Sequence, residues 1–348
     1  MKRLGFLGAM NRDIVAAVEA QKVIDALGLD AMPLVETGVS DAVAEAGAEL
    51  LSGQGANVIL GGSAFNTARV VALLNADNPA LALSFMGLAG AVGGAYPHLE
   101  ALEQWSVHAG SVTPSPLAPA TCIALVEPHG RTLLTATGAN AEIADLIRSD
   151  RGRLAVAMAG CDVVHITSYL DPEVPGLIAD LAAGARRINP ALQISLDPGT
   201  GWIIPGGEGL ARLMQAANIL HLNSEEFAHL GGPARIEAIM DGLAQGPALV
   251  VTRTHCGAVV YERDIAGNLK AYALDDTPLP PEEMVLDATG AGDTFCGGFL
   301  WALLGQSASP REAAALGFAL ARHKISQNGP LTAIPALHIA TGHTSASA

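Results

Sequence analysis

Asp287-Ala288-Thr289-Gly290-Ala291-Gly292-Asp293 is a glycine-rich stretch that follows an apolar strand end and leads into a helical run through residue 304. Glycine and alanine let the backbone approach a ligand closely, and the free N–H groups at a helix start can hold an anion. Asp293 lies beside this expected anion site, where its carboxylate is placed to accept a proton from a hydroxyl group. On these residues alone, the alternative is a plain turn in which Asp293 caps the helix.

Short apolar runs and helical stretches alternate along most of the remaining chain. The expected strands cover residues 4–8, 81–86, 163–166, 193–196, 219–222 and 249–252. Helical stretches, such as residues 174–187, separate these runs. Near-continuous apolar strands with helices between them predict an α/β fold, in which helices cover both faces of a mostly parallel sheet.

Two segments, residues 14–60 and 111–137, interrupt this alternation. In the first we expect a helix at residues 15–29. In the second, two strand-like runs at 122–127 and 132–135 predict a hairpin around a turn at residues 128–131.

We expect these two segments to fold together as a small β-containing lid. The α/β core is then made of residues 1–13, 61–110 and 138–340. The small polar residues at 341–348 are expected to form a flexible tail.

The chain is acidic, with a net charge of −15. Duplex nucleic acid and anionic membranes bind basic faces, so neither is an expected partner. The four cysteines form no CxxC pair, which disfavours disulfides and a zinc site and fits a cytoplasmic protein. Polar residues interrupt the apolar runs near the N-terminus, so we expect no signal peptide and no membrane span.

The glycine-rich stretch at residues 287–293 resembles the C-terminal signature of ribokinase-like (PfkB) kinases, D-T-x-G-A-G-D. Their N-terminal signature, G-G-x-x-x-N-x-A, is matched by Gly61-Gly62-Ser63-Ala64-Phe65-Asn66-Thr67-Ala68. Two signatures in the expected order are far more specific than either one. The resemblance extends through smaller pieces over most of the chain and implies a three-layer α/β/α core with a lid.

The resemblance implies an ATP-dependent phosphotransferase that acts on a hydroxyl group of a sugar or sugar-like substrate. Asp293 would be the general base, and the amides of Gly290, Ala291 and Gly292 would form the anion hole. The residues implied to bind substrate are Asn11, Asp13, Gly61, Gly62 and Asn66. The alternative for Asp13 and Asn66 is capping or turn chemistry.

ATP and Mg²⁺ are the cofactors that the resemblance implies. The residues implied to bind the nucleotide are Asn223, Glu226, Thr252, Gly257, Asn328 and Gly329. Glu226, with Asn223, would act on the magnesium ion through water. The alternative for this pair is a helix N-cap with a capping glutamate.

The chain also departs from the family pattern. Ala288 stands where a threonine is usual, and Thr254 replaces a glycine of the nucleotide turn. Residues 330–333 lack the clear hydroxyl that some members offer a monovalent cation, so the resemblance leaves potassium activation open. Residues 87–94 lack the acidic residue that is common there, which weakens any assignment of substrate contacts to that loop.

The substrate is left open between a free sugar and a nucleoside. The long first insertion resembles the lid of adenosine kinases, whereas Asn11-Arg12-Asp13 spaces its polar pair as ribokinase does. Tyr169 lies where adenosine kinases stack an aromatic ring on the base, although a buried core tyrosine is the commoner outcome. The lids of this family often pair two subunits, so the resemblance includes a homodimer through the lid among the alternatives for the oligomeric state.

Functions of other classes are less well supported. A non-catalytic binding protein on the same fold would not need a base at Asp293. A nicotinamide dehydrogenase is disfavoured because no G-x-G-x-x-G follows the first strand, and a P-loop kinase because the chain has no Gly-Lys pair.

Overall fold

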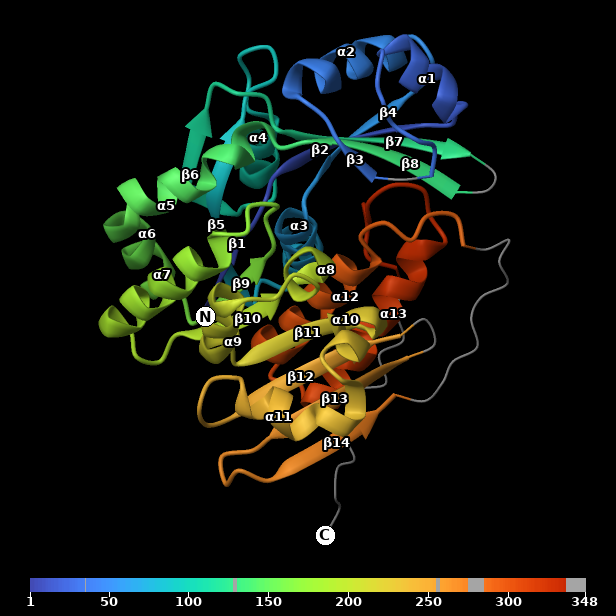
Figure 1. Cartoon of the computed structure of the whole chain (residues 1–348). Helices are drawn as coiled ribbons and strands as arrows, with labels where there is room; N and C mark the ends of the chain where they lie inside the picture. The colour runs from blue at the N-terminus through green and yellow to red at the C-terminus, as the bar shows by residue number, and fades with distance from the viewer. Residues whose placement is uncertain (35, 128–129, 255–256, 275–284, 336–348) are drawn as a thin grey trace.

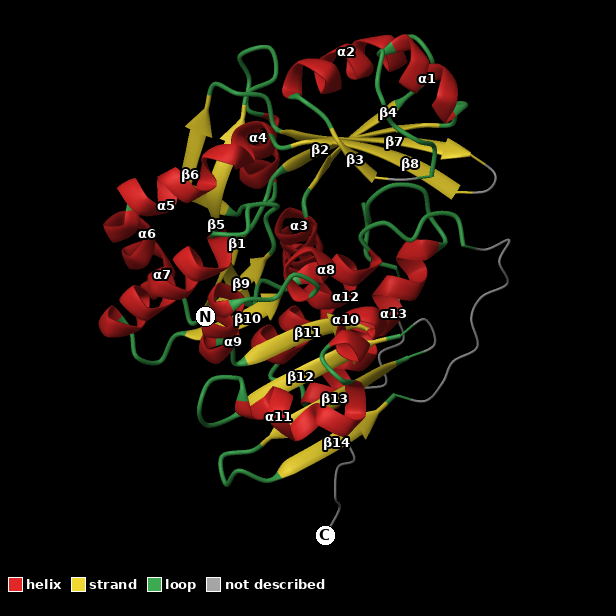
Figure 2. Cartoon of the chain, in the orientation of Figure 1, coloured by secondary structure: helices red, strands yellow, loops and turns green. Residues whose placement is uncertain are grey.

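The computed structural model describes residues 1–34, 36–127, 130–254, 257–274 and 285–335, and places a small sheet above a large α/β unit (Figures 1 and 2). Part of the turn predicted at 128–131 and the whole predicted tail lie outside these residues. Within the described part, no helix has both the length and the apolar character needed to cross a bilayer.

The large sheet has nine strands in the described residues, in the order β14-β13-β12-β11-β10-β9-β1-β5-β6. Its strands are β1 (Lys2–Leu7), β5 (Leu81–Gly90), β6 (His108–Ser115), β9 (Val163–Thr167), β10 (Gln193–Asp197), β11 (Ile219–Asn223), β12 (Ala248–Arg253), β13 (Ala258–Arg263) and β14 (Leu269–Ala273). Neighbours from β6 to β12 are parallel, and β13 and β14 are antiparallel additions at the edge. The predicted mostly parallel sheet is confirmed.

Helices cover both faces of the large sheet because its strands are apolar on both faces. One layer contains α5 (Ile143–Ser149), α6 (Arg151–Ala159), α7 (Val174–Ile188), α8 (Gly199–Ile203), α9 (Glu208–Ala216), α10 (Ser224–His229) and α11 (Ile236–Asp241). The other contains α3 (Ser63–Asp77), α4 (Pro97–Gln104), α12 (Ala291–Leu300), a π-helical turn (Trp301–Gly305) and α13 (Pro310–Ile325).

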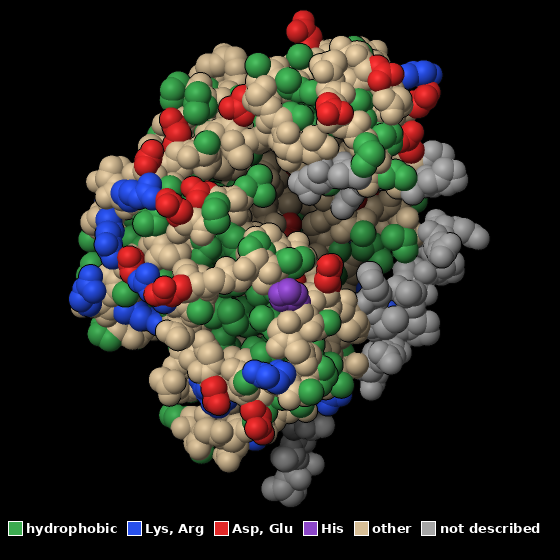
Figure 3. All heavy atoms as spheres, viewed as in Figure 1, with side chains coloured by type: hydrophobic (Ala, Val, Ile, Leu, Met, Phe, Trp, Pro, Cys, Tyr) green, Lys and Arg blue, Asp and Glu red, His purple; other side chains and the backbone are tan. Residues whose placement is uncertain are grey.

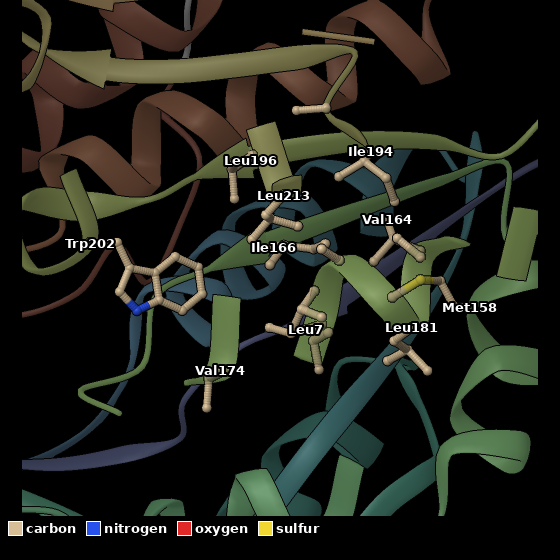
Figure 4. Close-up of a cluster of buried hydrophobic side chains, with 14 of the residues drawn as sticks. Leu7, Met158, Val164, Ile166, Val174, Leu181, Ile194, Leu196, Trp202 and Leu213 are labelled. Carbon is tan, nitrogen blue, oxygen red and sulfur yellow. The ribbon is translucent and has the colours of Figure 1, made fainter. Parts of the chain in front are cut away.

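Consecutive residues of a strand point to opposite faces of the sheet, so they pack against opposite helix layers. Phe6 packs in the core with α3, α12 and α13, while Leu7 packs in the core with α5, α6 and α7. Figure 4 shows the second core, where Val164 and Ile166 of β9 and Ile194 and Leu196 of β10 gather with helix residues.

The small sheet has five strands in the order β3-β8-β7-β2-β4. They are β2 (Asn11–Ala16), β3 (Glu36–Gly38), β4 (Asn57–Gly61), β7 (Ala120–Glu127) and β8 (Gly130–Ala136). Helices α1 (Ala20–Ala26) and α2 (Asp41–Ser52) cover its outer face around a core that includes Ile14, Leu51 and Ile123 (Figure 1). Because β1 runs almost directly into β2, this sheet lies beyond the C-terminal strand ends, where open α/β sheets bind ligands.

Three predicted segment boundaries fall inside strands and are therefore wrong, and one of them separates Gly61 from the rest of β4. Residues 11–13 belong to β2 of the small sheet, between β4 and β7, rather than to the core. Residues 111–115 belong to β6, which pairs with β5 in the large sheet. The helix predicted at 15–29 is also wrong in its first part, because residues 15 and 16 complete β2 and α1 begins at Ala20.

Candidate active site

A cavity of ≈ 860 Å³ lies between the inner face of the small sheet and the start of α12. Figure 3 shows the surface hollowed between these two parts of the molecule. Asp13 and Asn66 line the cavity, as do Gly290, Asn328 and Gly329. Residues that the sequence assigned to substrate and residues that it assigned to the nucleotide therefore share one cavity.

The glycine-rich stretch forms a turn that opens α12. Gly290 caps the helix with φ 75°, a left-handed conformation that favours glycine. The Thr294 hydroxyl donates to the Gly290 carbonyl oxygen at 2.8 Å and closes the first turn. Asp293 lies inside that turn rather than at the cap, so the alternative in which it caps the helix is wrong.

Asp293 is held by a residue of the other signature. The Asn66 side-chain amide donates from Nδ2 to Asp293 Oδ2 at 3.0 Å, which joins α3 to α12. Burial raises the pKa of the Asp293 carboxyl to about 6, although the hydrogen bond from Asn66 acts to lower it. At neutral pH this carboxyl group is therefore ionised and able to take a proton.

Arg69 is a buried arginine that the sequence analysis missed. Its guanidinium donates to Asn66 Oδ1 at 2.9 Å and to the Leu60 carbonyl oxygen at 2.5 Å, and its carbon Cζ lies 5.1 Å from the centre of the Trp105 ring. Burial lowers its pKa to about 10, against the charges of Asp13 and Asp293. Its position three residues after Asn66, on the same helix face, was the available signal.

Asp13 lies half-buried in the cavity wall, on strand β2 between β7 and β4. Burial raises the pKa of its carboxyl group to about 6, and the Arg69 charge acts to lower it. A Cβ atom at Gly61 would lie 2.2 Å from Asp13 Oδ2, and one at Gly62 would lie 2.1 Å from the Ala9 carbonyl oxygen. The backbone contact and the φ of 105° require glycine at position 62, whereas a side chain at position 61 would displace the Asp13 carboxylate.

Asn11 is built into the wall by neighbours that the sequence analysis did not single out. Its side-chain oxygen accepts from Asn140 Nδ2 at 3.1 Å, and its carbonyl oxygen lies 2.9 Å from His98 Nε2. Asn11 is not among the residues that line the cavity.

A buried ion pair lies behind the start of α12. Arg253, at the end of β12, binds Asp197, at the end of β10, with 2.9 Å between Nη1 and Oδ2. Burial acts to raise the pKa of Asp197, but the charge and hydrogen bonds of Arg253, together with the nearby His221 and His165, lower it overall to about 2. Arg253 also donates to the Gly292 carbonyl oxygen at 3.3 Å, so the pair fixes the helix start.

Comparison with known proteins agrees with this arrangement. The pfkB family of carbohydrate kinases matches residues 26–337, which is most of the chain. The chain belongs to this family.

Individual relatives are similar over different extents. A nucleoside kinase of Methanocaldococcus jannaschii is 29% identical over 174 residues, which are 50% of this chain and 52% of that protein. The chain thus spans about half the length of the curated relative that it matches.

Solved structures match over nearly the whole fold. Adenosine kinase of Schistosoma mansoni, in complex with 2-fluoroadenosine, has a TM-score of 0.74 at 14% identity, covering 95% of this chain and 97% of the other. A probable sugar kinase of Rhizobium etli has a TM-score of 0.71 at 22% identity, covering 97% and 96%. At these identities the likeness shows a shared fold, the predicted ribokinase-like one.

Asn223 and Glu226, which the family resemblance assigned to the nucleotide and magnesium, form a capping box at the start of α10. Glu226 N donates to Asn223 Oδ1 at 2.8 Å, and Asn223 N donates to Glu226 Oε2 at 2.9 Å. The structural alternative is therefore present in full. Asn223 is paired with Arg253 in the sheet register, which places the capping box close to the buried ion pair.

Thr252 and Gly257 flank the turn after β12 and do not line the cavity. The Thr252 hydroxyl donates to the Val259 carbonyl oxygen at 3.2 Å, within the sheet. Gly257 N donates to Thr254 Oγ1 at 3.0 Å, so the threonine that replaces the family glycine closes the turn with its own hydroxyl.

Tyr169 is 4% exposed and belongs to the core, so its ring is not available to stack on a ligand in the cavity. Among the described residues, no group of three or more His, Cys, Asp and Glu side chains could hold a metal ion.

Proposed function

We propose that this chain is an ATP-dependent kinase that transfers the γ-phosphoryl group to a ribose hydroxyl of a nucleoside, with Asp293 as the general base. The observation that carries the proposal is the hydrogen bond between Asn66 and Asp293, at the edge of a cavity that also contains Asp13 and Asn328. Membership of the pfkB family supports the phosphoryl transfer.

The chemical step needs one proton acceptor and one phosphate cradle. The substrate oxygen attacks the γ-phosphorus, the bond from this phosphorus to the ADP oxygen breaks, and the hydroxyl proton passes to Asp293. Asn66 donates to Asp293 Oδ2 and Ser63 also hydrogen-bonds this side chain, and the carboxylate has further lone pairs that can accept the incoming hydroxyl. The N–H groups of residues 290–292 at the helix start would stabilise the charge on the transferred group.

Magnesium fits this site only as a partner of the nucleotide phosphates. Mg²⁺ usually keeps several waters and binds through one or two carboxylates together with substrate phosphates. Both Glu226 oxygens accept a hydrogen bond from Asn223, and each keeps acceptor capacity for a water. Bound there, the ion would offset the negative charge of the phosphates.

The apolar wall of the cavity favours a nucleoside over a free sugar. The small sheet contributes aliphatic side chains from four strands, namely Val15, Ile59, Ala124, Val126 and Leu133. A nucleobase would cover this wall, whereas a free sugar would leave it in contact with water. Asp13 would then hold ribose hydroxyls. Several of the similar structures are adenosine kinases by name.

A panel of acceptors tests the proposal. Purified protein with ATP and Mg²⁺ is given nucleosides, ribose and other sugars in turn, and ADP release and the phosphorylated product are measured. We expect turnover with a nucleoside that exceeds turnover with ribose by at least about tenfold. Asp293→Asn in the same assay controls for contaminating kinases. A preference for free sugars would overturn the substrate assignment, and no turnover with any acceptor would overturn the kinase assignment.

A further inference from the structure

Lys324 is a lysine in the last turn of α13 whose side chain is only 1% exposed. Its ammonium nitrogen donates to the Asp287 carbonyl oxygen at 2.7 Å and to Asp287 Oδ2 at 2.9 Å. A buried ammonium group is expensive to desolvate, so lysine is rarely fully buried unless it is paired. Nothing in the proposed proton transfer uses this charge.

Asp287 begins the glycine-rich turn, and its neighbours hold it from several sides. Its Oδ1 accepts from Thr289 N at 2.8 Å, and its Oδ2 accepts from Gly329 N at 3.1 Å. Its own N–H donates to the Ile325 carbonyl oxygen at 3.3 Å. Lys324 therefore binds a residue that ties the glycine-rich turn to the C-terminal residues of the cavity wall.

The ligands of the Lys324 ammonium are those that a small monovalent cation takes in proteins. They are a backbone carbonyl oxygen and a carboxylate oxygen of the same residue. The pKa of Asp287 supports a lasting pair: burial acts to raise it, but the Lys324 and Thr289 hydrogen bonds lower it overall.

We propose that Lys324 is a positioning residue, a cation built into the chain that holds the turn at residues 287–290 in place for phosphoryl transfer. The enzyme then needs no free monovalent cation. This inference rests on the proposed function, because the turn that Lys324 holds is the proposed phosphate cradle. Substrate binding and proton transfer do not involve the buried Lys324 ammonium group, and the positioning role explains why it is there.

Kinetics with and without potassium test this inference. Wild type is assayed in about 100 mM KCl and in the same concentration of tetramethylammonium chloride, which keeps the ionic strength equal. We expect the two turnover rates to agree within about twofold. Lys324→Met fills the space without the charge, and we expect its kcat to fall by about 10–100-fold with KM nearly unchanged, because a small displacement of a catalytic group has effects of this size.

Two further variants separate positioning from general stability. Lys324→Ala leaves room for a small cation, so ammonium or potassium ions should restore part of its kcat, while Lys324→Met should not respond. Arg322→Met removes a charge from the same helix turn, where Arg322 lies over the Phe318 ring, and should keep kcat within about threefold of wild type.

The inference is overturned if potassium activates wild type several-fold, or if Lys324→Met keeps wild-type kcat. Hydrogen exchange provides a readout that does not need activity, because amides of residues 287–294 should exchange faster in Lys324→Met than in wild type. If wild type shows no turnover with any acceptor, the proposed function fails, and exchange still decides the positioning role. Equal exchange in both proteins would then refute that role.

Discussion

Three charged side chains, Asp13, Arg69 and Asp293, share a small polar region at one end of the cavity. Burial raises the pKa of both carboxyl groups to about 6, and Arg69 interacts with each of them. The two carboxylates are kept apart in role by their elements. Asp13 lies on a strand of the small sheet, whereas Asp293 lies in the first turn of α12, next to the glycine-rich turn at residues 287–290.

Asp293→Asn should lower kcat by about 10²–10⁴-fold with little change in nucleoside affinity, because it removes the proton acceptor and preserves shape. Stopped-flow or steady-state ADP release measures the rate, and calorimetry measures nucleoside binding. Turnover within about threefold of wild type would exclude Asp293 as the base.

Asp293 also predicts a pH dependence. Its pKa rises from 3.8 in the unfolded chain to about 6 in the folded protein. The native state therefore binds the proton more tightly, and stability from this group falls as pH rises between these values. We expect the Asp293→Asn substitution to raise the free energy of unfolding at pH 7 by up to about 3 kcal/mol and to have little effect on it near pH 4. Urea unfolding at both pH values checks this, and an equal change at both would contradict it.

Asp13→Asn should raise the KM for the nucleoside by about 10–100-fold, which is the expected effect of losing hydrogen bonds to a charged group. Its melting temperature should stay the same or rise, because a desolvated carboxylate is removed. Asp25→Asn, on the exposed side of α1, is the matched control and should leave both quantities unchanged. A normal KM with lost stability would show that Asp13 is structural.

At the scale of elements, the strand ends of the large sheet gather polar groups that no single strand carries. Asp197, Asn223 and Arg253 end β10, β11 and β12, which are neighbours in the sheet. Parallel strands end at the same edge, so these three residues meet although the chain separates them. The capping box at α10 then adds Glu226 to the same region.

Glu226→Gln tests whether the capping box also serves magnesium. Glutamine can replace glutamate in a capping box, so the melting temperature should change little. The Mg²⁺ concentration for half-maximal activity should rise several-fold, because a charged acceptor for magnesium-bound water is lost. Glu312→Gln, in the second capping box at α13, is the matched control and should leave the magnesium dependence unchanged. If Glu226→Gln shows the same magnesium dependence as wild type, Glu226 serves only as a helix cap.

At the scale of the whole molecule, the two faces of the small sheet have different neighbours. Its outer face packs on α1 and α2, and its inner face lines the cavity (Figure 1). Two copies that pair through the lid would thus meet through the helices rather than through the sheet face. The homodimer stays a prediction. We propose that this sheet, which lies over the cavity, is a lid that closes on substrate and keeps water from the γ-phosphate.

Hydrogen exchange with a nucleoside and a non-hydrolysable ATP analogue tests closure. Amides of residues 57–61 and 120–127 should gain protection, because closure removes the inner face from solvent. Residues 258–263, in β13 at the far edge of the large sheet, serve as an internal control and should not change. Equal exchange with and without ligands at residues 57–61 and 120–127 would exclude a closing lid.

The sequence alone determined the alternation of strands and helices, because this follows from the period of the apolar residues. It also determined the two glycine signatures and the glycine-rich turn at residues 287–293, because glycine is needed where the backbone adopts unusual conformations. Only the tertiary structure decided which distant residues complete the site. Arg69 interacts with Asp13 of the small sheet, Arg253 binds Asp197 two strands away in the large sheet, and Lys324 binds Asp287 from the end of α13. The same limit explains the wrong boundaries at residues 13, 61 and 111, since a strand's sheet is set by its pairing partners. The local sequence pattern does not specify which strand or which carboxylate a residue contacts in the assembled sheets.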